Sequence, residues 1–128
     1  MIKYEYPPNY DDIAAVFDLN GREIFAYDGI IYCPGKGVVT YELLAHETVH
    51  FQQQIDTGVK IWWDKYLTDT EFRLKQELPA HKGEYIVFLS RHKDRNERAR
   101  YLDLVASRLS SKLYGNIITK QQALKALK

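Results

Sequence analysis

The chain has 128 residues, of which 45% are hydrophobic and 13% aromatic, and its 18 basic side chains nearly balance 17 acidic ones. This size and composition fit one domain, residues 1–128, with a core that needs no disulfide. A net charge of +1 gives no reason to expect a nucleic-acid or membrane-surface partner, and the single cysteine, Cys33, excludes an internal disulfide.

Targeting signals are not recognisable in the sequence. The opening residues, MIKYEYPPNY, lack a basic segment followed by an apolar run, so no signal peptide is predicted. No apolar run approaches the roughly 18 residues that span a bilayer. We therefore expect a cytoplasmic protein with no membrane partner.

A small β-rich unit is expected near the N-terminus. Residues 10–19 read as a short helix with acidic residues in its first turn. Residues 22–35 contain two β-rich runs that flank Asp28 and Gly29. This pair favours a tight hairpin, because both turn positions require positive φ.

The rest of the chain is expected to be helical. Thr40 can cap a helix that ends near Gly58, and a short apolar element, 60–67, follows it. Thr68 and Glu71 form a capping-box pattern that predicts the start of another helix. That helix should extend to about Arg91 with a bend at Pro79, and further helices are expected at 94–114 and 119–127. Together these elements predict an α+β fold, in which a small antiparallel sheet is followed by a helical bundle.

The stretch 46-HETVH-50 lies within the predicted helix that follows Thr40 and has the HExxH pattern. Residues i and i+4 of a helix lie on one face, so His46 and His50 can direct their imidazoles at one metal ion. Glu47 is displaced around the helix and can reach a water molecule beside that ion. The pattern therefore predicts two zinc ligands and a general base.

A catalytic zinc site needs a third protein ligand and one open position. Neither of the longer zinc patterns that begin with HExxH is present, so this ligand must come from elsewhere. The next long helix carries Glu77, Ala80, His81 and Glu84 on one face. Either carboxylate or the imidazole of His81 is a candidate, and the small Ala80 would let the two helices approach closely.

These residues resemble the gluzincin branch of the HExxH metallopeptidases, in particular its minimal single-domain members. The resemblance covers residues 40 to about 90 and depends on HETVH followed by Gln53 and, 27 residues after His50, on Glu77 within ELPA. It implies a zincin-like domain in which His46, His50 and Glu77 hold zinc and Glu47 is the base. It also implies that an upstream edge strand, here 30–34, aligns an extended peptide substrate.

The sequence departs from the larger gluzincins at one position. Those proteins often have an aspartate four residues after the ligand glutamate, where it orients a ligand histidine, and here that position is His81. Glu84 is an alternative partner for the outer nitrogen of a ligand histidine.

Several neighbouring residues have competing interpretations. Arg73 either orients Glu77 or forms a surface pair, and Gln53 either bonds within the cleft or lies on a helix face. Trp62 and Trp63 either line a substrate pocket or pack with one ring buried and one half exposed, and we expect the second arrangement. Candidates to stabilise an oxyanion are Tyr66, His81, Tyr85 and His92, but packing is the favoured explanation and no oxyanion role is assigned.

The sequence therefore predicts a zinc metallopeptidase that acts on a peptide or protein substrate. The alternative is a zincin-fold binding protein with structural zinc and no proteolysis, and a third reading is a metal-free helical interaction domain. Glu47 favours the first, because a structural site has no use for a carboxylate beside its ligands.

Overall fold

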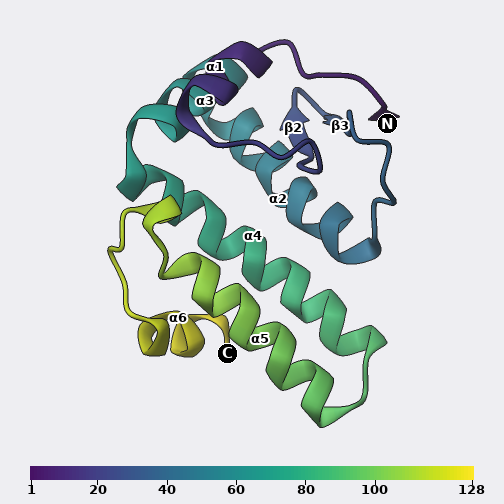
Figure 1. The fold of residues 1–128 in the computed structure, drawn as a ribbon, viewed down its shortest axis with the longest axis vertical. Coiled ribbons are helices and arrows are strands. Elements are labelled where there is room, and N and C mark those ends of the chain that lie inside the picture. The colour runs from purple at the N-terminus through teal and green to yellow at the C-terminus, as the bar shows by residue number, and fades with distance from the viewer.

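A three-stranded sheet and six α-helices make up the fold of residues 1–128 in the computed structural model (Figure 1). The elements in chain order are β1 (Ile2–Lys3), α1 (Tyr10–Val16), β2 (Phe25–Tyr27), β3 (Ile30–Tyr32), α2 (Tyr41–Thr57), α3 (Val59–Thr68), α4 (Thr70–Arg91), α5 (Arg95–Leu109), the 3₁₀-helix η1 (Lys112–Tyr114) and α6 (Lys120–Leu127). This arrangement confirms the predicted α+β class. None of the helices combines the length and the apolar composition of a membrane span.

The predicted hairpin is present as β2 and β3. Asp28 and Gly29 form its turn with φ of 51° and 80°, as the tight turn requires. The strand order is β1-β3-β2, with β1 parallel to β3. The prediction that 30–34 is an edge strand is therefore wrong. The backbone of β1 pairs with the outer edge of β3, and the sequence gives no local signal for such pairing.

The helix that carries HETVH is held at its start and along its length. Thr40 caps it by accepting a hydrogen bond from the amide of Leu43 at 3.2 Å. Gln54 then joins α2 to the hairpin, because its side chain donates to the carbonyl of Ala26 and accepts from the amide of Asp28. The register of α2 is thereby fixed relative to β2.

The long helix α4 starts one residue later than the capping-box pattern predicts. Thr68 is the last residue of α3 and donates its hydroxyl to the carbonyl of Asp64. Asp69 is the cap instead, and its carboxylate accepts from the amides of Glu71 and Phe72. Pro79 lies inside α4 and does not interrupt it.

Two more helices end earlier than predicted. The first helix ends at Val16 rather than near residue 19, and α5 ends at Leu109, after which η1 forms a separate short turn.

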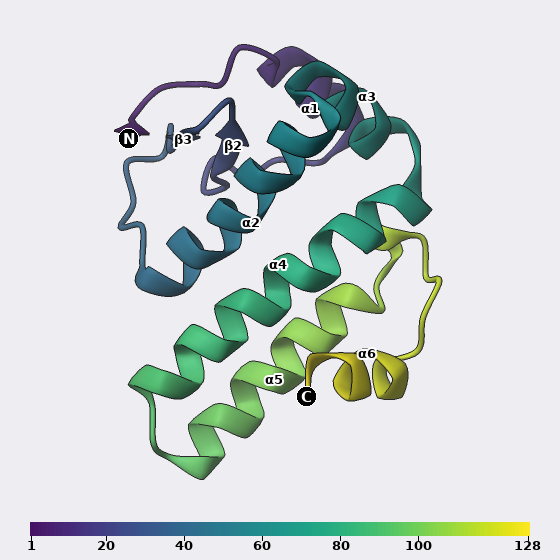
Figure 2. The same ribbon diagram turned by 180° about the vertical axis from the view of Figure 1, so that it is seen from behind.

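Helix α4 lies between α2 on one side and α5 on the other (Figure 2). One hydrophobic cluster joins α1, the hairpin and α3, and it includes Ile13, Phe25 and Trp62. The other cluster joins α4 to α5 and α6. The polar faces of α2 and α4 meet between the two clusters, and this is where the predicted site residues lie.

Candidate metal centre

The three predicted residues of α2 lie on the side of that helix that faces α4. His46, Glu47 and His50 are 7%, 6% and 5% exposed, although two of them are basic and one is acidic. Buried polar groups of this kind are costly unless they have partners. The two histidines find such partners on α4, whereas Glu47 forms no hydrogen bond or ion pair.

Glu77 of α4 completes a group of three ligand atoms. Its Oε1 lies 3.3 Å from Nε2 of His46 and is also ion-paired with Nε2 of His50. The two Nε2 atoms are 3.1 Å apart. Zinc bonds of about 2.0–2.1 Å in tetrahedral geometry place neighbouring ligand atoms about 3.3 Å apart. The two separations that involve Nε2 of His46 are close to this spacing, so these residues could hold a metal ion.

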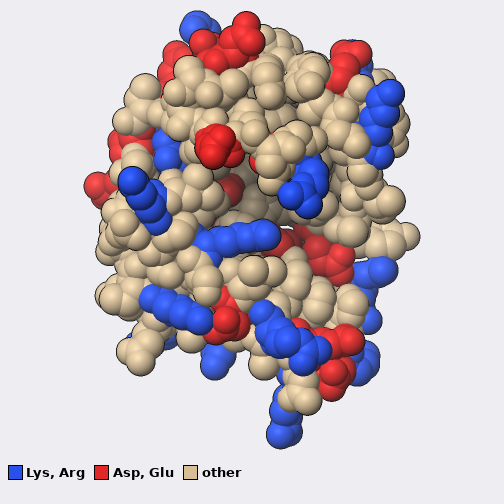
Figure 3. Space-filling model, viewed as in Figure 1, with Lys and Arg blue, Asp and Glu red and all other residues tan.

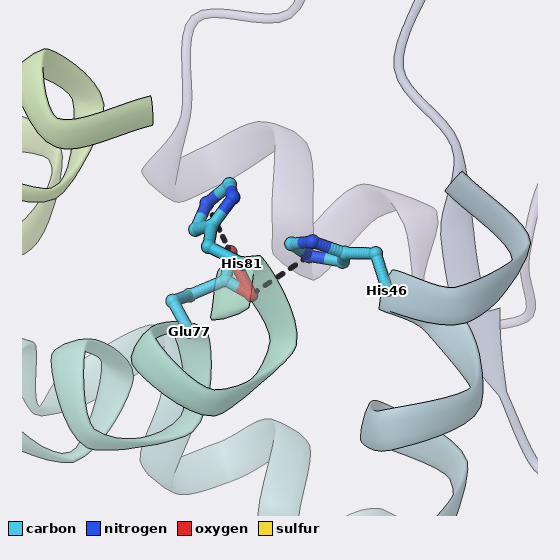
Figure 4. A group of neighbouring side chains, drawn as sticks. All are labelled: His46, Glu77 and His81. Carbon is cyan, nitrogen blue, oxygen red and sulfur yellow. Dashed lines mark hydrogen bonds and ion pairs between the residues drawn. The ribbon is translucent and has the colours of Figure 1, made fainter. Parts of the chain in front are cut away.

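A second group of donors shares His46 and Glu77 and adds His81 (Figure 4). One ligand atom from each of the three residues lies within 4.8 Å of the others. The Nε2 of His81 is 3.8 Å from Oε2 of Glu77, so this group is wider than the group with His50. The tighter spacing favours His50 as the closer ligand.

Glu84 fixes the orientation of two imidazoles from behind. Its Oε1 accepts from Nδ1 of His46 at 2.7 Å and from Nδ1 of His81 at 2.6 Å, and its Oε2 accepts from the hydroxyl of Tyr101. Burial raises the pKa of this carboxyl, but the hydrogen bonds from His46 and His81 outweigh it and lower the pKa to about 2. Glu84 is therefore held as an ionised acceptor of hydrogen bonds from both imidazoles and from Tyr101.

His50 and Glu77 also have hydrogen-bond partners outside the group that they form with His46. Nδ1 of His50 donates to Oε1 of Gln53 at 2.8 Å, and Gln53 in turn donates to the carbonyl of Gln76 at 2.9 Å. The hydroxyl of Tyr114 donates to Oε2 of Glu77 at 2.9 Å. Such outer bonds set the tautomer and the direction of metal ligands.

Tyr101 and Tyr114 were not singled out by the sequence. They come from α5 and η1, and nothing in their local pattern distinguishes them from the other eight of ten tyrosines.

The charges of the site are strongly coupled. Burial lowers the pKa of His46 and His50, but the Glu77 carboxylate outweighs burial and raises the pKa of both imidazoles above the usual value. Burial raises the pKa of Glu77, yet the two imidazoles hold it well below the usual range. Metal binding must therefore displace protons from the two histidines.

Glu47 differs from the other two carboxylates. It is buried and forms no hydrogen bond or ion pair, and burial raises its pKa above the usual value. A carboxylate whose pKa is raised in this way holds a proton more strongly than an exposed one, which favours a role as a general base.

The site opens into a cavity of about 500 Å³. His46, Glu47, His50 and Glu77 line one side of it, and residues 17–20 and 22–26 line another. Figure 3 shows the hollow near the middle of this face, with acidic side chains in it and basic side chains on its rim. The basic lining residues are Arg22 and Arg108.

Of the four candidates for oxyanion stabilisation, Tyr66 and His81 line the cavity and the other two do not. Tyr85 packs in the core between α4 and α5. His92 lies at the far end of α4, stacked on Phe88.

Arg73 has neither of its predicted roles. It is buried and donates to the carbonyls of Tyr66, Leu67 and Leu113. It therefore neither orients Glu77 nor forms a surface pair.

Both tryptophans are buried, whereas one was expected to be half exposed. Both also line the cavity. The indole of Trp62 donates to Gln76, and that of Trp63 donates to the carbonyl of Ala26. The two bonds hold α3 against α4 and β2 respectively.

Comparison with known proteins identifies no relative of this chain. No protein-family model, no curated protein and no solved structure matches the chain.

Proposed function

We propose that this protein is a zinc-dependent peptidase in which His46, His50 and Glu77 hold the metal. The observation that carries the proposal is the convergence of these three ligand atoms beside a buried carboxylate, Glu47, that has no partner of its own. A structural zinc site would need the ligands and not the free carboxylate. The gluzincin resemblance of HETVH and Glu77 agrees with this assignment.

Zinc bound there supplies Lewis-acid chemistry, since it lowers the pKa of a water molecule towards about 7 and polarises a carbonyl. Glu47 accepts the proton of the attacking water on its carboxylate. As the C–N bond of the substrate breaks, the protonated Glu47 returns this proton to the departing amine nitrogen. The raised pKa of Glu47 suits both transfers, because the group must gain and then lose a proton.

The wall of the cavity opposite α2 suits an extended peptide. Glu23 and Ile24 line the cavity just before β2, and their backbone groups make no hydrogen bond to other backbone. Farther along β2, Gln54 and Trp63 already occupy the carbonyl of Ala26. We therefore assign the peptide-aligning edge to residues 23–24 rather than to the central strand β3.

The proposal is tested with a Glu47→Gln variant, which keeps the size of the side chain and removes the base. Zinc-loaded wild type is expected to cleave members of a broad peptide library. The variant is expected to bind zinc as the wild type does and to lose about 10²–10⁴-fold in cleavage rate.

Glu42→Gln is the matched control. Glu42 is another buried acid of α2, which pairs with Arg91 at 3.4 Å and not with the site. Cleavage that survives in Glu47→Gln, or a zinc-loaded wild type that cuts no peptide, would leave the structural-zinc alternative as the better account.

A further inference from the structure

His81 presents one unsatisfied nitrogen to the metal centre. The residue is 4% exposed, and its buried Nε2 has no hydrogen-bond partner. The nearest acceptor, Oε2 of Glu77, is 3.8 Å away and already accepts from the hydroxyl of Tyr114. A buried polar atom without a partner is costly and requires an explanation.

The chemical state of that nitrogen follows from the contact at the other side of the ring. A carboxylate only accepts hydrogen bonds, so Nδ1 of His81 carries a hydrogen that it donates to Oε1 of Glu84. In the neutral imidazole Nε2 then has a free lone pair. His46 donates to the same Glu84 oxygen, so one carboxylate prepares both histidines as Nε2 ligands.

The imidazole rings of His46 and His81 also lie close together beside the carboxylate of Glu77. The ring centroids of His46 and His81 are 4.6 Å apart, and both imidazoles approach the carboxylate of Glu77 from different helices (Figure 4). The ligand atoms of His46, Glu77 and His81 lie within 4.8 Å of one another, which exceeds the tetrahedral spacing of about 3.3 Å by at most roughly 1.5 Å. A small shift of one side chain closes this gap.

We propose that His81 is a displaceable fourth protein ligand of the ion held by His46, His50 and Glu77. In the closed state three imidazoles and one carboxylate fill the tetrahedral set, and no position is left for water or substrate. In the open state His81 has left and the fourth position is free. This inference rests on the proposed zinc site and adds that the site is latent until a stronger ligand or a substrate displaces His81.

The number of ligand imidazoles can be counted with Co²⁺ in place of zinc. Each imidazole bound to Co²⁺ through Nε2 gives one strongly shifted, exchangeable N–H signal from its Nδ1 in proton NMR. Because Nδ1 of His46, His50 and His81 is hydrogen-bonded to Glu84 or Gln53, all three protons are retained. We expect three such signals from the wild type and two from His81→Gln.

The control is His92→Gln, because His92 is the remaining histidine and lies outside the cavity. It should keep all three signals. Two signals in the Co²⁺-loaded wild type would overturn the role of His81 and leave the three-ligand site intact. A wild type that binds no Co²⁺ would overturn the metal site and the inference together.

Displacement is measured by titrating the zinc-loaded proteins with acetohydroxamate, a small ligand that needs the open position. A closed state that must open first weakens the apparent affinity by the fraction of open protein. We therefore expect His81→Gln to bind acetohydroxamate more tightly than the wild type, and His92→Gln to bind it equally. Equal affinity of the wild type and His81→Gln would show that His81 does not compete for the position.

Discussion

The outer carboxylate Glu84 gives the sharpest single test of the metal centre. Glu84→Gln keeps the shape of the side chain but replaces one acceptor oxygen with an NH₂ donor. Glu84 now accepts from His46 and His81 at Oε1 and from Tyr101 at Oε2, so the amide oxygen can still accept from both imidazoles but without the negative charge of the carboxylate. We expect the variant to fold and to bind zinc more weakly, because His46 then donates to a neutral amide oxygen, which holds its orientation less strongly than a carboxylate.

The size of the effect follows from two independent magnitudes. Loss of an outer-shell partner typically reduces metal affinity about 10–100-fold, which corresponds to about 1.4–2.7 kcal/mol. A hydrogen bond to a charged group contributes about 1.5–3 kcal/mol, and the bond from Nδ1 of His46 at 2.7 Å is of this kind. The two ranges overlap at roughly 2 kcal/mol, so we expect a loss of about thirtyfold.

The measurement is a competition for zinc between the protein and a chromophoric chelator at constant pH. Circular dichroism of the metal-free proteins checks that the helices are retained. Glu42→Gln is the control for removing one buried carboxylate, and its affinity should equal that of the wild type. Unchanged affinity in Glu84→Gln, or an equal loss in Glu42→Gln, would refute the outer-shell role.

Two further predictions concern pH and the cavity wall. Since the pKa values of His46 and His50 are raised above 6.5, both imidazoles must lose a proton to bind zinc. The affinity for zinc should therefore rise with pH above about 6.5, by up to about tenfold per pH unit for each histidine. An affinity that does not change with pH in the same competition assay would contradict the assignment of both histidines as ligands. A Cβ on Gly35 would meet the backbone carbonyl of Gly21, so Gly35→Ala should displace residues 20–24 and lower the thermal stability by about 1–3 kcal/mol. Gly35→Ala should also raise KM without changing zinc affinity. A Cβ on Gly37 meets nothing within 4 Å, so Gly37→Ala should match the wild type in stability, KM and zinc affinity.

The features that the sequence predicts well are those set by neighbouring residues. The hairpin turn depends on Asp28 and Gly29 alone, and the start of α2 depends on the side chain of Thr40. The spacing of His46 and His50 on one helix likewise follows from the helical period. The cap of α4 shows the limit of this reasoning, since Thr68 and Asp69 both have suitable side chains. Only the continuation of α3 through Thr68 decides between them.

The features that the sequence does not predict depend on contacts between distant segments. β3 is central because β1, nearly 30 residues earlier, pairs with its outer edge. Tyr114 reaches Glu77 from 37 residues away, and Tyr101 reaches Glu84 from 17 residues away. Arg73 was expected to interact along its own helix, but its donors point to the end of α3 and to Leu113. None of these contacts leaves a periodic signal in the sequence.

The buried charges between α2 and α4 bear on the choice between a metal site and a metal-free interaction domain. Six of the ionisable side chains buried there belong to the candidate site: His46, Glu47, His50, Glu77, His81 and Glu84. Apolar residues would join two helices as well, since replacing buried ion pairs with packed hydrophobic residues is often neutral or stabilising by about 1–4 kcal/mol. Among the six, Nε2 of His81 is buried without a hydrogen-bond partner, and Glu47 lines the cavity without a hydrogen bond or ion pair. A metal ion at this site would give His81 a ligand role and Glu47 a water molecule to deprotonate, two roles that helix packing alone does not supply.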